Sequence, residues 1–366
     1  MTVYLDNAAT TKIHPDVLEE MIDSLKDYGN SEGKFHSFSE NAKKRINKAR
    51  NIIASCVGVN TDEIIFTSGA TEANNFVLKG LIDVYPNKKK IIISSFEHSS
   101  IDATANYLQK KGYEIVRVPV DKTGLIDLNF LEESIDDNTI LVSIMWVNNE
   151  IGTIQQMDRI DEICSKHAVF LHSDAVQALG KVHIDLNKYK ALKSITISAH
   201  KIYGPKGIGA LILKKDNDGI RYNLTPLLHG GDQEFGYRAG TLSNELIVGF
   251  GKACEIVCKD IDENCKILDE LEISLLAELR KMFGEALFVN NDFTNRIPGL
   301  LNVQIEGINN MILLKKLSPF IAASNGSNCS ITKPSRTLKA IGLNDMEINS
   351  SIRLSLSIFD SKSMLL

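Results

Sequence analysis

The sequence lacks any pair of cysteines spaced as in a metal or dithiol site. Its six cysteines are scattered and none lies in a CxxC pair, so we expect no bound metal and no disulfide. Cys254 and Cys258 are four residues apart in a segment with helical periodicity, which is typical of small buried side chains on one helix face. Cys329 differs, because it lies in a run of small polar residues where a cysteine is either incidental or a nucleophile.

The chain also lacks a long apolar run, a secretory signal and a basic segment. No apolar stretch approaches the length needed to cross a membrane, and residues 1–6 have neither the charged start nor the apolar core of a signal peptide. With a net charge of -5 and no basic run, nucleic acid is not expected as a partner. We therefore expect a cytoplasmic protein with no nucleic-acid or membrane partner.

The chain contains a regular alternation of strand and helix patterns. Its 366 residues suit a large domain plus a smaller one. Runs rich in β-branched and apolar residues predict strands at 64–67, 90–95, 113–119, 140–147, 169–174, 194–198 and 210–213. Amphipathic segments between them predict helices. The fold class is therefore α/β, with a mostly parallel sheet.

From residue 242 the pattern changes to one long predicted helix that extends to about residue 282. Short strand and helix patterns follow it, which predicts a small α+β domain. We place the large, ligand-binding domain at residues 15–255. The small domain is formed by residues 1–14 and 256–366, and it includes the Cys329 loop.

Lys201 lies in a turn directly after the strand 194–198, among polar residues, glycines and a proline. A lysine held there can be kept partly dry, lose its proton more readily and bind a carbonyl compound covalently. Most lysines in turns are simply solvated. Lys201 alone therefore leaves both interpretations open.

Further polar residues follow the carboxyl ends of several other predicted strands. In open parallel sheets that edge is where ligands bind. Each residue has an ordinary structural explanation as well: a histidine satisfied within a loop, an asparagine that caps a turn, or a buried carboxylate with its own partner. Their joint occurrence at one edge favours a ligand site. These residues are Thr71, His98, Asn149, Asp174, Gln177 and Lys201.

The ligand that needs a lysine, an acidic residue and a phosphate cradle together is pyridoxal phosphate. The lysine binds the aldehyde, a carboxylate keeps the pyridine nitrogen protonated, and the phosphate binds at a helix N-terminus. The predicted turn from Ser68 to Thr71, between a strand and a helix that begins at Glu72, has the geometry of such a cradle. A nicotinamide site would need a GxGxxG turn after the strand 64–67, and this pattern is absent.

Eight motifs then resemble, in order along almost the whole chain, those of the cysteine desulfurases of the NifS/IscS type in the class V aminotransferase family. The resemblance implies the type I fold of pyridoxal-phosphate-dependent transferases, with a seven-stranded sheet in the large domain. The motifs are Leu5 to Thr11, Thr67 to Asn75, Glu97-His98, Asn148 to Thr153, His172 to Gln177, Ser198 to Gly207, Gly230 to Thr241 and Gly326 to Ser330.

The resemblance also implies a role for each site residue. Lys201 would hold the cofactor, Asp174 would pair with the pyridinium nitrogen and Gln177 with the ring oxygen, while His98 would stack on the ring and take part in proton transfer. Asn149 and Arg353 would bind the substrate carboxylate. The phosphate would be held by Ala70, Thr71, Ser198 and His200, together with Thr241 from the other subunit of a homodimer.

By the same resemblance, the substrate is L-cysteine and Cys329 is the thiolate that attacks its sulfur. The products would be L-alanine and a Cys329 persulfide, which passes its sulfur to an acceptor protein such as an iron–sulfur cluster scaffold or a thiolation enzyme. The polar loop around Cys329 suits a residue that must approach the cofactor and then move outward.

The chain departs from the family pattern at three places. Asn328 replaces the usual alanine before the cysteine, the loop 30–39 is altered, and the C-terminal region after Ser357 is short. Two alternatives therefore stay open. One is a related pyridoxal phosphate lyase acting on selenocysteine or kynurenine, and the other is a truncated paralogue of low activity.

Overall fold

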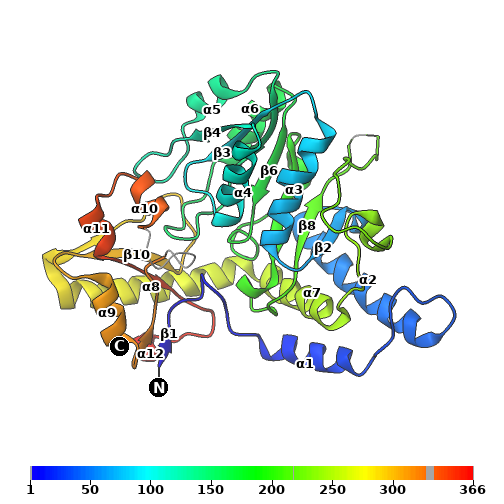
Figure 1. Cartoon of the computed structure of the whole chain (residues 1–366). Coiled ribbons are helices and arrows are strands. Elements are labelled where there is room, and N and C mark those ends of the chain that lie inside the picture. The colour runs from blue at the N-terminus through cyan, green and yellow to red at the C-terminus, as the bar shows by residue number, and fades with distance from the viewer. Residues whose placement is uncertain (1, 217, 327–333, 366) are drawn as a thin grey trace.

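The large sheet forms the centre of the molecule (Figure 1). The computed structural model describes residues 2–216, 218–326 and 334–365. Seven described strands pair in the order β2-β8-β7-β6-β5-β3-β4, and every neighbouring pair is parallel except the two that involve β8. This confirms the predicted α/β fold with a mostly parallel seven-stranded sheet. The strands are β2 (Ile64–Thr67), β3 (Lys90–Ser94), β4 (Glu114–Val118), β5 (Thr139–Ser143), β6 (Phe170–Asp174), β7 (Leu192–Ser198) and β8 (Gly209–Leu213).

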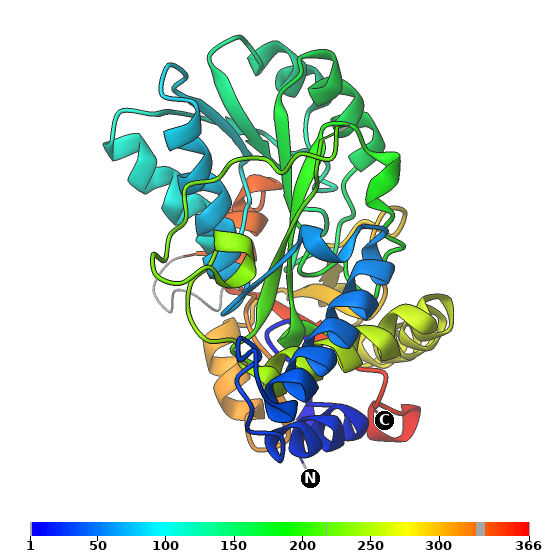
Figure 2. The same ribbon diagram turned by 90° about the vertical axis from the view of Figure 1, so that its right-hand side faces the viewer.

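Helices cover both faces of this sheet, which is why its strands are almost continuously apolar. Successive strand residues point to opposite faces: Ile92 packs with one core cluster, whereas Ile91 and Ile93 pack with another. α3 (Ala70–Val84) and α4 (Ser99–Lys110) cover one face. α2 (Ser37–Val57), α6 (Met157–Lys166) and α7 (Asn244–Lys259) cover the other (Figure 2).

The helix predicted over residues 242–282 is two helices. α7 ends at Lys259 and α8 (Ile261–Phe283) begins after Asp260, whose φ of -124° and ψ of 41° are not helical. The Asp260 carbonyl accepts from the Asn264 backbone N–H and so opens α8. An aspartate favours helix starts over helix interiors, and this preference accounts for the break.

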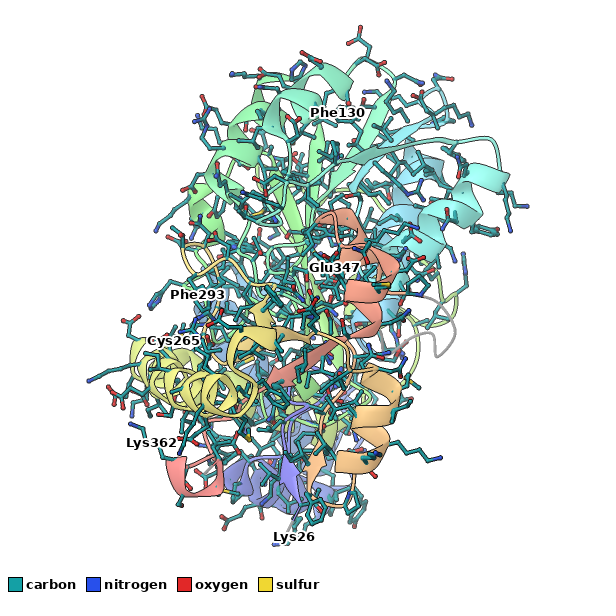
Figure 3. All side chains as sticks on the ribbon, turned by 90° about the vertical axis from the view of Figure 1, so that its left-hand side faces the viewer. Lys26, Phe130, Cys265, Phe293, Glu347 and Lys362 are labelled. Carbon is teal, nitrogen blue, oxygen red and sulfur yellow. The ribbon has the colours of Figure 1, made fainter. Side chains whose placement is uncertain are left out.

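A second core lies beside the large sheet. β9 (Leu287–Val289), β10 (Leu300–Ile305) and β12 (Ser351–Ser355) form an antiparallel sheet in the order β12-β10-β9, and leucines of α8 pack against it. In Figure 3, Cys265 marks α8 and Glu347 marks α11 (Asp345–Asn349) on this side of the molecule.

The N-terminus joins this second core. β1 (Val3–Tyr4) pairs in parallel with β11 (Ile321–Ala322), and Asp6 bridges to Ser355 beyond the end of β1. The N-terminal residues therefore lie with the C-terminal part of the chain, as expected if residues 1–14 and 256–366 share a domain. The domain limits themselves remain a prediction.

The remaining described helices connect these layers, and those after residue 334 were not predicted. No helix of the described segments is both long and apolar enough to span a membrane. These helices are α1 (Pro15–Leu25), α5 (Leu128–Ser134), α9 (Asn310–Leu317), α10 (Arg336–Ala340) and α12 (Lys362–Leu365).

Candidate active site

The glycine turn after β2 is held against β8 by a close approach of two backbones. A Cβ on Gly209 would lie 2.7 Å from the Ile197 carbonyl oxygen and 2.9 Å from the Gly69 Cα, so only glycine fits at the start of β8. Gly209 lies opposite Thr67 of β2 and opposite Ser198 of β7. The start of α3, with Ala70 and the exposed Thr71, is thereby brought to the same edge of the sheet as Ser198.

Lys201 ends a short 3₁₀ turn, Ala199–Lys201, directly after β7. Its Nζ donates to the carbonyl oxygens of Ala8 and Ala9, at 2.7 and 2.6 Å. Burial, followed by the positive charges of Arg353 and Lys181, lowers the pKa of Lys201 to about 8. About a tenth of this amine is therefore unprotonated at pH 7, far more than for a solvated lysine, and a carbonyl-binding lysine reacts in that form.

Gln177 is buried and points to the same place as Lys201. Its Nε2 donates to the Ala8 carbonyl at 3.0 Å, and its Oε1 accepts from Lys181 Nζ at 2.8 Å. Because an ammonium group can only donate, Lys181 fixes which end of the Gln177 amide faces Ala8. Sequence reasoning did not find Lys181, although it lies only four residues after Gln177.

Asp174 is the last residue of β6 and is buried, as predicted. Its Oδ2 accepts from Asn74 Nδ2 at 2.8 Å, and its Oδ1 accepts from the Val176 backbone N–H at 3.1 Å. His98 begins α4 and contacts Ser100, which in turn contacts Asn74. Asn74 and Ser100 were not predicted as site residues, although Asn74 lies within the Thr67 to Asn75 motif and is buried.

His200 lies next to Lys201 in the same turn. Its Nδ1 is 3.2 Å from Thr10 Oγ1. Burial, followed by the positive charges of Lys201 and Lys206, lowers the pKa of His200 to about 4, so the imidazole is neutral at physiological pH. It can therefore act as a hydrogen-bond donor without adding charge.

Arg353 comes from β12 of the second core and is 1% exposed. Its Nη1 donates to the Asn149 carbonyl oxygen at 2.8 Å, and its Nη2 donates to Asp6 Oδ1 at 2.8 Å and Ser324 Oγ at 3.1 Å. Its Nε has no partner among the described residues. The predicted pair of Arg353 and Asn149 is thus in contact, through the asparagine backbone.

Thr241 is exposed, on the loop that leads into α7. Two ion pairs hold this loop: Arg238 with Glu72 in the first turn of α3, at 3.0 Å, and the buried pair of Arg50 and Glu234. Cys329 lies outside the described residues. The chain up to Gly326 is described, and Ser324 contacts Arg353, so the loop that carries Cys329 starts at the site.

The model of the family described as "Aminotransferase class-V" matches residues 3–364. The chain belongs to this family.

The relatives share one activity in their names. "Cysteine desulfurase IscS" of Rickettsia rickettsii (strain Iowa) is 38% identical, over 99% of this chain and 88% of that protein. The protein of the same name from Proteus mirabilis (strain HI4320) is 41% identical, over 99% of this chain and 89% of that protein. A solved structure named "NIFS-LIKE PROTEIN" superposes with a TM-score of 0.92 at 34% identity, over 100% of this chain and 96% of that one. The predicted resemblance to cysteine desulfurases of the NifS/IscS type is confirmed.

Members of the class-V aminotransferase family depend on pyridoxal phosphate, and the residues of this site fit that cofactor. In pyridoxal phosphate the ring carbon that carries the aldehyde group is next to the ring carbon that bears the phenolic oxygen. Lys201 Nζ and Gln177 Nε2, the predicted partners of these two groups, converge on one carbonyl oxygen, that of Ala8. A buried carboxylate, Asp174, is available for the ring nitrogen.

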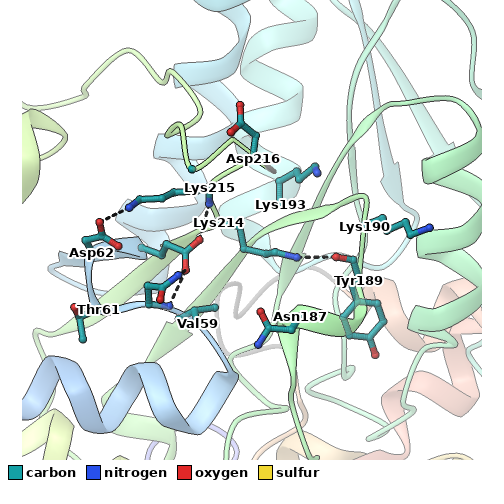
Figure 4. Close-up of a pocket in the computed structure, with 13 residues that line it drawn as sticks. Val59, Thr61, Asp62, Asn187, Tyr189, Lys190, Lys193, Lys214, Lys215 and Asp216 are labelled. Carbon is teal, nitrogen blue, oxygen red and sulfur yellow. Dashed lines mark hydrogen bonds and ion pairs between the residues drawn. The ribbon is translucent and has the colours of Figure 1, made fainter.

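A cavity lies elsewhere among the described residues, at the opposite edge of the large sheet from Lys201 (Figure 4). Its volume is about 860 Å³, and its walls are the segments before β2 and β7 and the segment after β8. Two of its lysines are engaged: Lys214 donates to the Leu186 and Tyr189 carbonyls, and Lys215 pairs with Asp62. None of the predicted site residues lines this cavity.

Proposed function

We propose that this protein is a pyridoxal-phosphate-dependent cysteine desulfurase, which converts L-cysteine to L-alanine and a Cys329 persulfide. The observation that carries the proposal is the convergence of Lys201 and Gln177 on one oxygen, with Asp174 buried after the neighbouring strand. The relatives at 38–41% identity are named for this activity.

The cofactor, when bound, supplies an electron-withdrawing ring that makes the α-proton of an amino acid acidic. Asp174 would hold the protonated ring nitrogen by its charge, and Gln177 would donate to the ring oxygen. The backbone at the start of α3, at Ala70 and Thr71, would bind the phosphate together with Ser198, His200 and the Thr241 of a second copy. Helix N-termini attract anions because their first N–H groups are unpaired.

The amine of Lys201 takes the α-proton. Its pKa of about 8 places it close to the pH at which it must both accept and release a proton. Arg353 binds the substrate carboxylate with Asn149. The guanidinium group keeps a buried Nε without a partner among the described residues, which supports a further hydrogen bond on ligand binding.

The Cys329 thiolate attacks the sulfur of the substrate. A bond forms between the two sulfur atoms, and the bond between the substrate sulfur and Cβ breaks with its electron pair left on Cβ. Protonation of Cβ, with His98 as the proton donor, and return of a proton from the Lys201 amine to Cα complete L-alanine. The persulfide then passes its sulfur to an acceptor protein, such as an iron–sulfur cluster scaffold.

The protein also acts as a homodimer in this proposal, because Thr241 would complete the phosphate site of the other subunit. Exposed apolar residues on α1 and the following loop support a second chain contact; they include Leu18, Ile22, Leu25, Tyr28 and Phe35. We place the protein in the cytoplasm, because the five cysteines among the described residues are free thiols, as a reducing compartment favours.

The test is the release of alanine and sulfide from L-cysteine in the presence of a reductant. We expect equal amounts of both from the wild-type protein, and a large loss of both in Cys329→Ala, which should keep its cofactor absorbance. Turnover of selenocysteine or kynurenine without turnover of cysteine would assign the related lyase activity instead. Equal rates of alanine release for wild type and Cys329→Ala would rule out Cys329 as the nucleophile.

A further inference from the structure

Asn74 lies at the centre of a buried hydrogen-bonded network that connects two residues of the proposed site. It is fully buried on α3. Its Nδ2 donates to Asp174 Oδ2 and to Ser100 Oγ, both at 2.8 Å, and its Oδ1 lies 3.1 Å from His172 Nε2. The side chains it contacts come from β6 and α4, so one amide joins three elements.

The chemistry of the partners fixes the orientation of this amide. An ionised carboxylate only accepts hydrogen bonds, so the nitrogen of Asn74 faces Asp174. The oxygen then faces His172, whose Nε2 must carry a proton in order to donate. His172 Nδ1 is left to accept from Ser194 Oγ at 2.8 Å. Burial lowers the pKa of His172 to about 3, so this histidine is neutral, as the assignment requires.

The same reasoning continues to His98. The Ser100 backbone N–H donates to His98 Nδ1 at 3.2 Å, and a backbone N–H cannot accept. His98 Nδ1 is therefore unprotonated in the neutral ring, and the proton is on Nε2. Ser100 Oγ lies 2.8 Å from the same Nδ1. Because Oγ already accepts from Asn74, its own hydrogen is directed to Nδ1.

We infer that Asn74 is a positioning residue. It donates hydrogen bonds to both the Asp174 carboxylate and Ser100, and Ser100 in turn keeps the ring proton of His98 on Nε2. Hydrogen bonds then run in one direction from Ser194 through His172, Asn74 and Ser100 to His98. The network leaves Nε2 as the nitrogen that carries the proton in the neutral His98 ring. The functional importance of this arrangement rests on the proposed function, whereas the proton position does not.

The test is the position of the ring proton of His98. If the network only stabilised the core, substitutions in it would leave this position unchanged. Protein labelled with ¹⁵N-histidine, purified with its cofactor and kept free of substrate, is measured by NMR spectra that distinguish protonated from unprotonated ring nitrogens. His98→Gln assigns the signal. The variants are Asn74→Leu and Ser100→Ala, and Ser194→Ala is the matched control at the far end of the network.

We expect wild-type His98 to be protonated on Nε2 alone. In Asn74→Leu and Ser100→Ala the Nδ1-protonated form should rise by about fivefold, the change in ratio produced by loss of one ordinary hydrogen bond. Ser194→Ala should alter the His172 signals and leave those of His98 unchanged. A wild-type His98 protonated on Nδ1, or variants with the wild-type proton position, would overturn the inference.

If Asn74→Leu does not fold, Ser100→Ala decides the question, since it removes one oxygen atom and leaves the backbone N–H in place. Alanine production is not read in this experiment. Failure of the proposed desulfurase function would appear in the alanine assay, and failure of the present inference would appear in the NMR spectra.

Discussion

Lys201 and Gln177 donate to the same atom, the carbonyl oxygen of Ala8, at 2.7 and 3.0 Å. Residues from the turn after β7, from the loop after β6 and from the N-terminal segment thus meet at one point. The carbonyl of Ala8 satisfies the buried Gln177 amide, and Lys201 Nζ divides its hydrogen bonds between the carbonyls of Ala8 and Ala9. The same two donors suit the aldehyde and the ring oxygen of pyridoxal phosphate.

The lowered pKa of Lys201 predicts the pH dependence of cofactor binding. Only the unprotonated amine reacts with an aldehyde, so the rate at which cofactor-free protein binds added pyridoxal phosphate should rise with pH and level off above about pH 8. An ordinary lysine, with a pKa of 10.5, would give a rate still rising at pH 10. Stopped-flow absorbance measures this profile, and Lys201→Ala shows the background.

Lys181 should affect Lys201 through its charge. Since the charge of Lys181 is one of the causes that lower the pKa of Lys201, Lys181→Met should raise that pKa and slow cofactor binding at pH 7 by a few-fold. The exposed Lys188 provides the control, Lys188→Met. A binding profile of Lys181→Met that coincides with that of Lys188→Met would contradict the prediction.

Replacing glutamate by glutamine should have very different effects on stability at two buried positions, Glu97 and Glu272. Burial raises the pKa of Glu97 to about 8, so this side chain is protonated at neutral pH and Glu97→Gln should change the free energy of unfolding by less than about 1 kcal/mol. Burial raises the pKa of Glu272 as well, but the ion pair with Arg296 and the hydrogen bond from the Gly299 backbone N–H oppose that shift and favour the ionised form. Glu272→Gln leaves a buried charge unpaired and should cost about 3 to 5 kcal/mol. Urea unfolding at pH 7 compares the two variants. Equal losses of unfolding free energy would exclude a protonated Glu97 together with an ionised Glu272.

His172 should make the protein sensitive to acid. Its pKa is about 3 in the folded protein and 6.5 in a solvated chain, so below pH 6.5 the unfolded state binds the extra proton and stability falls as the pH falls. Between pH 7 and pH 5 this one group should remove about 2 kcal/mol of unfolding free energy. Unfolding at pH 7 and at pH 5 gives two free energies of unfolding. The difference between them should be smaller in His172→Gln than in the wild type by about 2 kcal/mol. An unchanged difference would show that His172 is charged or exposed.

Much of the site could be predicted from sequence because its residues follow strand ends. Alternating apolar patterns are local, so the strands that precede Asp174 and Lys201 could be located, and parallel strands bring their carboxyl ends to one edge. The order of the motifs then indicated the family. The break at Asp260 was missed because helical periodicity continues across it, although the preference of aspartate for helix starts was readable from the sequence.

The sequence by itself determined the α/β class, the parallel sheet and the residue types of the site, because these depend on periodicity and on the chemistry of single side chains. Only the tertiary structure decided which of these residues touch. Arg353 pairs with Asp6, and Asn74 lies between Asp174 and Ser100, although these partners are far apart along the chain. Such contacts depend on how separate elements pack, and so do the burial and neighbouring charges that set the pKa of Lys201.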